Sequence, residues 1–348
     1  MSGARRITAP VTVLLLGLSV GCKSTPILEY SLDVPAQTLI VPGAPPVRDG
    51  RPRFREIFCA LLARAPGDRA RPCDALLHRL SDEADTARLA RPLPSRDPTL
   101  AVLFVPGLLG ECAYGLAPPF ESTVKRLRNL GYDARVSQVN AASTSHANAD
   151  RLAQEIEAMG SEHLVLIGHA RGAVDILDLL VTKPTVASRV VAVLSVAGAI
   201  NGSPLASDPV GSDLLFSRGD TTQCTLGERE ALSDLSPAHR LRWLMDHPLP
   251  ERPRYFSLAA FAPLSEVSPP LRPRAFALSR IDPRNDGLVP FFDQVIPGSE
   301  LLGYADADHW SIATEPTGAE QSLPALRDVL IEAALLRISE VLASEATR

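Results

Sequence analysis

A turn within residues 164–173 is the part of the sequence whose residue types and spacing point most directly to chemistry. Four apolar residues, typical of a buried strand, run into Gly168, and Gly172 follows where a helical pattern starts. A strand that turns this tightly into a helix presents its central side chain above the sheet, and glycines are needed where a Cβ would clash. The central residue is Ala170. Its methyl group has no lone pair and no proton to give up, so no acyl intermediate can form on it.

This turn resembles the nucleophile elbow of the α/β-hydrolase fold family, and specifically that of its lipase- and esterase-like members. The resemblance extends over roughly residues 99–345. Ala170 stands where the family usually has its nucleophilic serine. The resemblance implies a small-molecule ester or acyl ligand, bound without a cofactor.

Three further stretches are similar to the family's other site segments. Residues 104–110 resemble its oxyanion loop, in which the N–H of Leu108 would pair with the N–H of Arg171. Asp286, followed by a glycine, resembles the family's acid, and His309, 23 residues later, resembles its catalytic histidine. In these roles Asp286 would orient the imidazole of His309, which would take the proton of a nucleophile.

Other residues compete for these roles. Asp282 and Asp308 are alternative acids, although Asp308 is next to His309 in sequence and would need an awkward turn to reach the ring. The alternative nucleophiles, none of which stands in a tight strand-to-helix turn, are Ser195, Ser203 and the adjacent pair Ser145 and His146.

Because residue 170 is an alanine, three interpretations of the activity are open. Without the nucleophile, the oxyanion hole and substrate binding sustain an acceleration of only about 10³–10⁴ over water, whereas a working enzyme reaches at least about 10⁶. The chain is therefore expected to turn over an ester poorly or not at all. Alternatively, it is a non-catalytic binding or scaffold protein of the cell envelope, or an active serine hydrolase whose nucleophile was replaced by alanine.

Alternating apolar runs and helical patterns predict the elements that position these residues. A continuous apolar run is typical of a parallel strand buried on both faces, and alternation with helices indicates a doubly wound, mostly parallel α/β sheet. The expected strands are residues 100–105, 134–139, 164–167, 190–196 and 255–261, and the expected helices lie near 120–130, 147–159 and 172–181, with a closing helix from 326.

Two further parts of the chain lie outside these predicted elements, an N-terminal extension and an inserted segment. The extension, residues 22–98, is Pro-rich but contains a helical apolar stripe that starts at Phe54. Residues 199–252 interrupt the α/β alternation and are expected to form a cap over the C-terminal edge of the sheet. The hydrolase domain would then comprise residues 99–348.

The first 21 residues read as a targeting segment. Arg5 and Arg6 precede an apolar run over residues 11–20, which is too short to span a bilayer. The stretch that ends at Cys22 resembles a bacterial lipoprotein box, although Ser19 stands where that box usually has an aliphatic residue. The resemblance implies an exported protein, anchored to a membrane of a bacterial cell envelope through a lipidated Cys22.

Cysteine use agrees with export. Four further cysteines permit two disulfides, of which we favour Cys59–Cys73 because it closes a short loop, leaving Cys112–Cys224, although four free thiols are also possible. No Cys/His grouping has zinc spacing, so no metal is expected. The net charge of −5 over 348 residues suggests no nucleic-acid partner.

Overall fold

The computed structural model describes most of the chain beyond its first 42 residues. Its two compact units are residues 1–31, none of which is described, and Leu32–Arg348, which contains all of the described residues. The predicted lipidation site Cys22 and residues Leu108, Cys112 and Cys224 lie outside the described residues. The described ranges are 43–64, 72–84, 93–107, 118–140, 143–207, 233–314 and 326–347.

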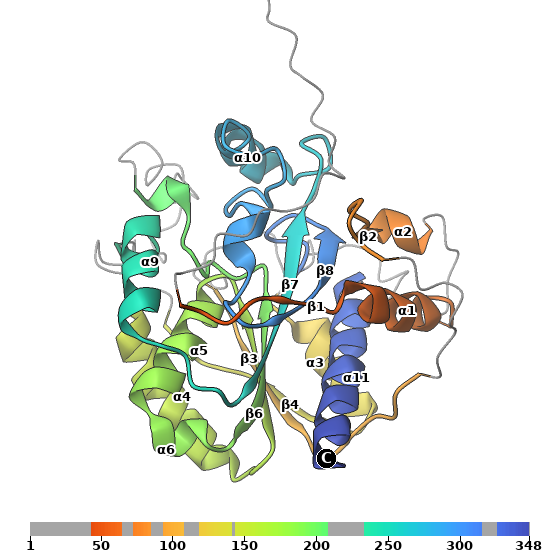
Figure 1. Ribbon diagram of the computed structural model, residues 1–348, viewed down its shortest axis with the longest axis vertical. Coiled ribbons are helices and arrows are strands. Elements are labelled where there is room, and N and C mark those ends of the chain that lie inside the picture. Colours follow the sequence, from red (N-terminus) through yellow and green to blue (C-terminus); the bar gives the residue numbers. More distant parts are fainter. Residues whose placement is uncertain are drawn as a thin grey trace, which may run out of the picture. The chain divides into compact units, whose positions relative to one another are not determined.

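Within the described ranges, eight strands form one sheet, in which six of the strands lie side by side and run parallel. Their order across the sheet is β4-β3-β5-β6-β7-β8, with β1 beyond β8. The short β2 pairs antiparallel with β8. The chain therefore forms the predicted doubly wound parallel sheet (Figure 1). The strands are β1 (Arg48–Asp49), β2 (Leu77–His78), β3 (Ala101–Val105), β4 (Asp133–Val136), β5 (Leu164–His169), β6 (Val190–Val196), β7 (Arg254–Phe261) and β8 (Glu300–Asp306).

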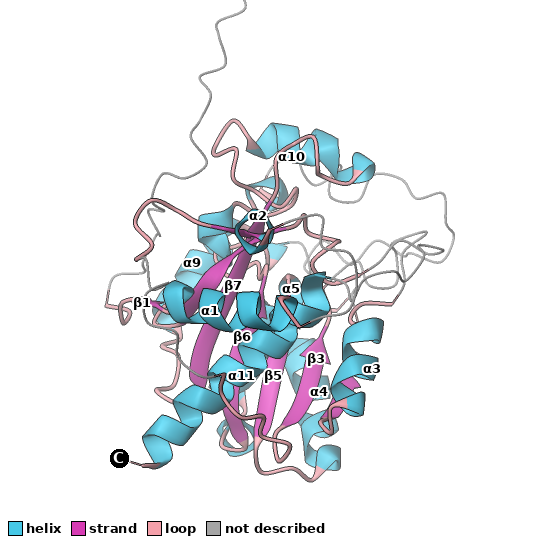
Figure 2. Cartoon of the chain, turned by 90° about the vertical axis from the view of Figure 1, so that its right-hand side faces the viewer, coloured by secondary structure: helices cyan, strands magenta, loops and turns pink. Residues whose placement is uncertain are grey.

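Helices cover both faces of the sheet, as Figures 1 and 2 show. One face carries α1 (Arg51–Leu62), α3 (Glu121–Asn129) and α11 (Leu326–Ala346), and the other carries α4 (Ser145–Met159), α5 (Arg171–Thr182), α6 (Pro184–Ala187) and α9 (Pro237–Asp246). Along each strand, successive side chains point to opposite faces of the sheet. In β3, Val102 and Phe104 join one apolar cluster, while Leu103 and Val105 join the other. This double burial is why the strand sequences are apolar throughout.

Helix α9 lies within residues 199–252, the segment predicted to form a cap over the sheet. Leu244 of that helix belongs to the apolar cluster on the α4–α5 face, and the guanidinium of Arg240 donates to the carbonyl of Ile200 at 3.1 Å. Helix α9 therefore packs on a face of the sheet, where Leu244 is buried and Leu241 and Trp243 are partly buried. Residues 208–232 of the expected cap lie outside the described ranges.

A small lobe that was not predicted lies beyond the end of β7 (Figure 1). It contains η2 (Pro269–Leu271) and α10 (Arg272–Leu278). Leu271 and Leu278 share an apolar cluster with Val174 of α5 and with Leu288 and Val289. The lobe thus packs against the first turns of α5 and against the segment that follows Asp286.

The N-terminal extension packs onto the sheet and supplies its two short strands, β1 and β2. The apolar stripe that begins at Phe54 is buried in the cluster that contains α11. A disulfide joins Cys59 to Cys73 in α2 (Cys73–Leu76), with their Cα atoms 5.5 Å apart. None of the described helices is both long enough and apolar enough to cross a membrane.

We predict that Arg55→Met destabilises the protein by about 3 to 5 kcal/mol, because it leaves a buried carboxylate without its counter-charge. The guanidinium of Arg55 donates to both carboxylate oxygens of Glu83, which is fully buried, and to the carbonyls of Leu77 and His78. Urea unfolding measures the loss. Arg135→Met is the control: its pair with Asp133 is half-exposed, so it should cost less than about 0.5 kcal/mol. Equal losses in the two variants would contradict the prediction.

Candidate active site

The turn between β5 and α5 has the backbone strain expected of an elbow. Ala170 joins the two elements with φ 52° and ψ −122°, and it is buried. A positive φ in a residue with a side chain costs about 1 to 3 kcal/mol and persists only where the surroundings enforce it. Two glycines allow the close approach: a Cβ on Gly168 would collide with the backbone of Ala173, and a Cβ on Gly172 would collide with the carbonyl of Val105.

The segment that follows β3 passes directly beside this turn. A Cβ on Gly107 would lie 2.6 Å from the Cβ of Ala170 and 3.4 Å from the backbone nitrogen of Arg171. Two segments predicted to form the oxyanion hole are thus adjacent at the N-terminus of α5. Leu108 itself, the proposed second donor, lies outside the described residues.

Asp286 and His309 meet in a buried hydrogen bond. Nδ1 of His309 lies 2.7 Å from Oδ2 of Asp286, and the backbone nitrogen of His309 donates to the carbonyl of Asp286 at 2.8 Å. The other carboxylate oxygen, Oδ1, accepts from the backbone nitrogens of Leu288 and Val289 at 2.8 and 2.7 Å. Both side chains are almost completely buried. The backbone therefore holds Oδ1 of Asp286 in place, while Oδ2 orients the imidazole of His309.

His169 connects this pair to the elbow. It is the last residue of β5, immediately before Ala170, and its imidazole Nε2 lies 2.9 Å from the carbonyl oxygen of His309. The two imidazole rings pack with their centroids 4.8 Å apart. Burial lowers the pKa of His169 well below its usual value, and the neighbouring His309 lowers it further. The elbow and the Asp286–His309 pair therefore share one buried contact.

Comparison with solved structures identifies the fold family. A metagenomic carboxyl esterase, MGS0156, is 36% identical and superposes with a TM-score of 0.77, covering 88% of this chain and 96% of that one. This chain is an α/β hydrolase related to carboxylesterases and lipases. Neither a protein-family model nor a curated protein matched the sequence.

Two lipases share the fold of this α/β hydrolase at lower identity. The mature form of lipase BlEst2 from Bacillus licheniformis is 18% identical, with a TM-score of 0.53, and the alignment covers 72% of this chain and 96% of that one. Lipase 1 from Pelosinus fermentans is 13% identical, with a TM-score of 0.52, and the alignment covers 70% of this chain and 99% of that one.

The two alternative acids of the hydrolase are engaged elsewhere. The carboxylate of Asp282 pairs with the guanidinium of Arg284 at 2.8 Å. The carboxylate of Asp308 accepts backbone hydrogen bonds from Ser268, Trp310 and Ser311, and so closes the turn that holds His309.

The alternative nucleophiles Ser195 and Ser203 are also engaged in other hydrogen bonds. The hydroxyl of Ser195 donates to the carbonyl of Gln294, and the hydroxyl of Ser203 donates to the carbonyl of Leu288. His146, beside Ser145, has its Nδ1 3.3 Å from a carboxylate oxygen of Asp178 on α5. Among the described residues, His309 forms no hydrogen bond with any of these serines.

Gln294 is a member of the site that sequence analysis missed. Its fully buried amide nitrogen lies 3.3 Å from Oδ2 of Asp286 and also donates to the carbonyls of Ala260 and Val289. Its amide oxygen accepts from the backbone nitrogen of Ala260. Gln294 therefore ties the acid to the end of β7. No spacing rule marks a glutamine eight positions after an aspartate, so the sequence carries no signal for it.

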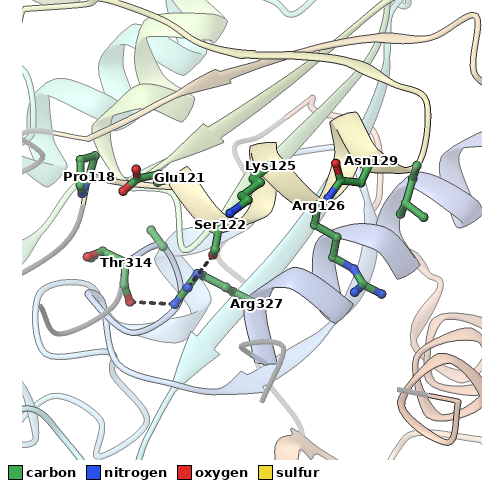
Figure 3. A pocket seen from close by; sticks show the side chains of 10 residues that line it. Pro118, Glu121, Ser122, Lys125, Arg126, Asn129, Thr314 and Arg327 are labelled. Carbon is green, nitrogen blue, oxygen red and sulfur yellow. Dashed lines mark hydrogen bonds between the residues drawn. The ribbon is translucent and has the colours of Figure 1, made fainter. Parts of the chain in front are cut away.

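A separate pocket of about 450 Å³ lies beside α3 and does not include the Asp286–His309 pair (Figure 3). The guanidinium of Arg327 donates there to Ser122 and to the carbonyl of Thr314. Lys125 points into the same hollow. The hydrogen bonds of Arg327 connect α11 to α3 and to the segment after His309. Arg327 therefore stabilises the helix layer that flanks the site.

We predict that Gly172→Ala destabilises the hydrolase by about 2 kcal/mol, because the new methyl group must push the carbonyl of Val105 away. Helix propensity alone predicts the opposite sign, a gain of about 1 kcal/mol. The free energy of unfolding, measured in urea, decides between the two. Gln154→Gly and Gln154→Ala, at an exposed position within α4, report the propensity difference without a collision. A stabilised Gly172→Ala variant would show that the elbow is not crowded.

Proposed function

We propose that this α/β hydrolase binds a carboxylic ester or an acyl compound at the C-terminal end of its sheet and hydrolyses it slowly or not at all. The observation that carries the proposal is the buried hydrogen bond between His309 and Asp286, formed beside a strained elbow on which Ala170 stands. The 36% identical relative is a carboxyl esterase, which supports the choice of an ester as ligand.

The geometry supports a separate role for each residue of the site. The carboxylate of Asp286 would hold the Nδ1–H tautomer of His309, which leaves the imidazole Nε2 free to accept a proton. The backbone nitrogen of Arg171, at the start of α5, would donate to the negative charge that develops on the ester oxygen, together with that of Leu108. Ala170 supplies no oxygen for attack on the carbonyl carbon, so the acyl-enzyme route stops before its first step.

The strain at the elbow supports descent from a working nucleophile. An alanine that only linked a strand to a helix would gain nothing from a positive φ, which costs about 1 to 3 kcal/mol. Here the residues on either side are closely packed, because a Cβ at Gly168 or Gly172 would collide with neighbouring backbone. The chain thus keeps the backbone that a nucleophile requires at a position where the hydroxyl is missing.

We predict that Ala170→Ser raises kcat/KM on short- and medium-chain p-nitrophenyl esters by at least about 100-fold over the parent chain. This is the gap between the residual acceleration of a hydrolase without its nucleophile and that of a working one. Initial rates measure the gain, and covalent labelling by a fluorophosphonate tests whether the new serine is the reactive one.

Two controls make this experiment specific. Ala197→Ser installs the same hydroxyl at the end of the neighbouring strand, on another alanine with positive φ, and should give no activity. Adding His309→Ala to Ala170→Ser should remove nearly all of the gain, because the nucleophile and the histidine act as a unit. If the parent is already fast and Ala170→Ser changes nothing, the elbow assignment is wrong. If the parent binds ester-like ligands and Ala170→Ser stays inactive, a binding role is favoured.

We also propose that the protein is exported and anchored to a membrane of a bacterial cell envelope through a lipidated Cys22. The arginines, the short apolar run and the small-residue approach to Cys22 support this proposal. A disulfide between Cys59 and Cys73 agrees with it, because such bonds persist in oxidising compartments.

Cys22→Ser should abolish incorporation of labelled palmitate and leave an unprocessed precursor, because the thiol is the atom that carries the lipid. Metabolic labelling of producing cells, with and without globomycin, checks this. Palmitate incorporated equally by Cys22→Ser and the parent would contradict the anchor, whereas loss of label with retained folding would support it.

A further inference from the structure

His169 has contacts that the proposed acyl chemistry does not use. It is a buried residue at the end of β5, and the mechanism assigns it no proton to transfer. Its ring is surrounded by the ring of His309, at 4.8 Å, and the edge of Phe120, at 6.0 Å between centroids. A polar side chain in such a place costs free energy unless its hydrogen-bonding groups are satisfied.

The hydrogen bond of His169 defines its protonation. A pKa lowered by burial and by the neighbouring His309 keeps this imidazole neutral near pH 7. A neutral imidazole has a single N–H, and the group 2.9 Å from Nε2 is the carbonyl oxygen of His309, which can only accept. The proton must therefore reside on Nε2 and be donated to that carbonyl.

His309 is consequently tied at three of its polar groups. Its backbone nitrogen and its Nδ1 bond to Asp286, and its carbonyl accepts from His169. The remaining polar atom is the imidazole Nε2, which the proposed function requires to be free. The first two contacts fix the residue relative to β7 and its following turn, and the third fixes it relative to β5 and the elbow.

Phe120 supports the same arrangement from the flanking helix. It has a positive φ of 61°, its ring packs on Phe104 at 4.7 Å, and its backbone nitrogen donates to the carbonyl of Ala313. Ala313 lies four residues after His309. Phe120, Ala170 and Ala197 are the non-glycine residues of positive φ among those described, and their strained backbones border the same end of the sheet.

We propose that His169 is a positioning residue of this site, which donates the Nε2 hydrogen of its imidazole to the carbonyl of His309 and thereby holds the His309 ring beside residue 170. This inference rests on the proposed function for its catalytic meaning, because His309 is the proton acceptor there. The hydrogen bond itself is testable without any catalysis.

The first test uses the full Ala170 chain and nitrogen-15 NMR of its imidazoles. We expect His169 to remain neutral, with its proton on Nε2, at a pH at which exposed histidines are charged. In His169→Met the Nδ1–H of His309 should exchange with water at least about tenfold faster, because local opening is easier once the turn is released. His169→Gln, whose amide also donates, should keep the exchange rate within about threefold.

The second test measures activity in the Ala170→Ser background. Adding His169→Met should lower kcat by roughly 10- to 100-fold with little change in KM, which is the effect of misplacing a reacting group by about 1 Å. Adding His169→Gln should restore most of that kcat. If His169→Met does not fold, His169→Asn serves instead, because its shorter amide cannot reach the same carbonyl.

The outcomes separate this inference from the proposed function. If Ala170→Ser stays inactive but His169→Met still speeds exchange of the Nδ1–H of His309, the acyl-transfer roles of the proposed function are contradicted and the positioning role is supported. Unchanged exchange at His309 and unchanged kcat in His169→Met, with only a lower free energy of unfolding, would overturn the positioning role and leave His169 a packing residue.

Discussion

A buried carboxylate that accepts four hydrogen bonds is the interaction on which the rest of the site depends. Asp286 receives two bonds from the backbone that follows it, one from His309 and one from Gln294. A buried charge persists only when its acceptor sites are filled in this way. Three of the donors lie between Leu288 and Gln294, and the fourth, His309, follows β8, so the carboxylate joins the segment that contains η3 (Phe291–Gln294) to the segment after β8.

The parallel sheet determines where these regions can meet. Each strand delivers its following segment to the same end, so the elbow after β5, the acid after β7 and the histidine after β8 become neighbours. Ala170 keeps its strained backbone conformation within this packed sheet, in which Gly172 lies against β3. A strained turn and an oriented imidazole are thus both present in a chain that has an alanine at position 170.

Local patterns predicted much of this, and long-range contacts account for what was missed. The elbow was predictable because a buried strand, two glycines and a helix start lie within ten residues. Strand β8 was not, because its Glu300 is buried only through an ion pair with Arg337 of α11, 37 positions away. Likewise, Gln294 bonds to Ala260 and His169 bonds to His309, and both pairs are far apart in sequence, so no local pattern predicts these contacts. The sequence of α9 also does not specify the face on which that helix packs.

A crystal structure of the Ala170 chain tests the central claim most directly through one distance, from the imidazole Nε2 of His309 to the methyl carbon of residue 170. If the site is an intact hydrolase framework that lacks only its oxygen, this distance should be about 3 to 4 Å, with Nδ1 still bonded to Asp286. A His309 ring that points away from residue 170, or that has lost Asp286, would show that these residues do not form one site.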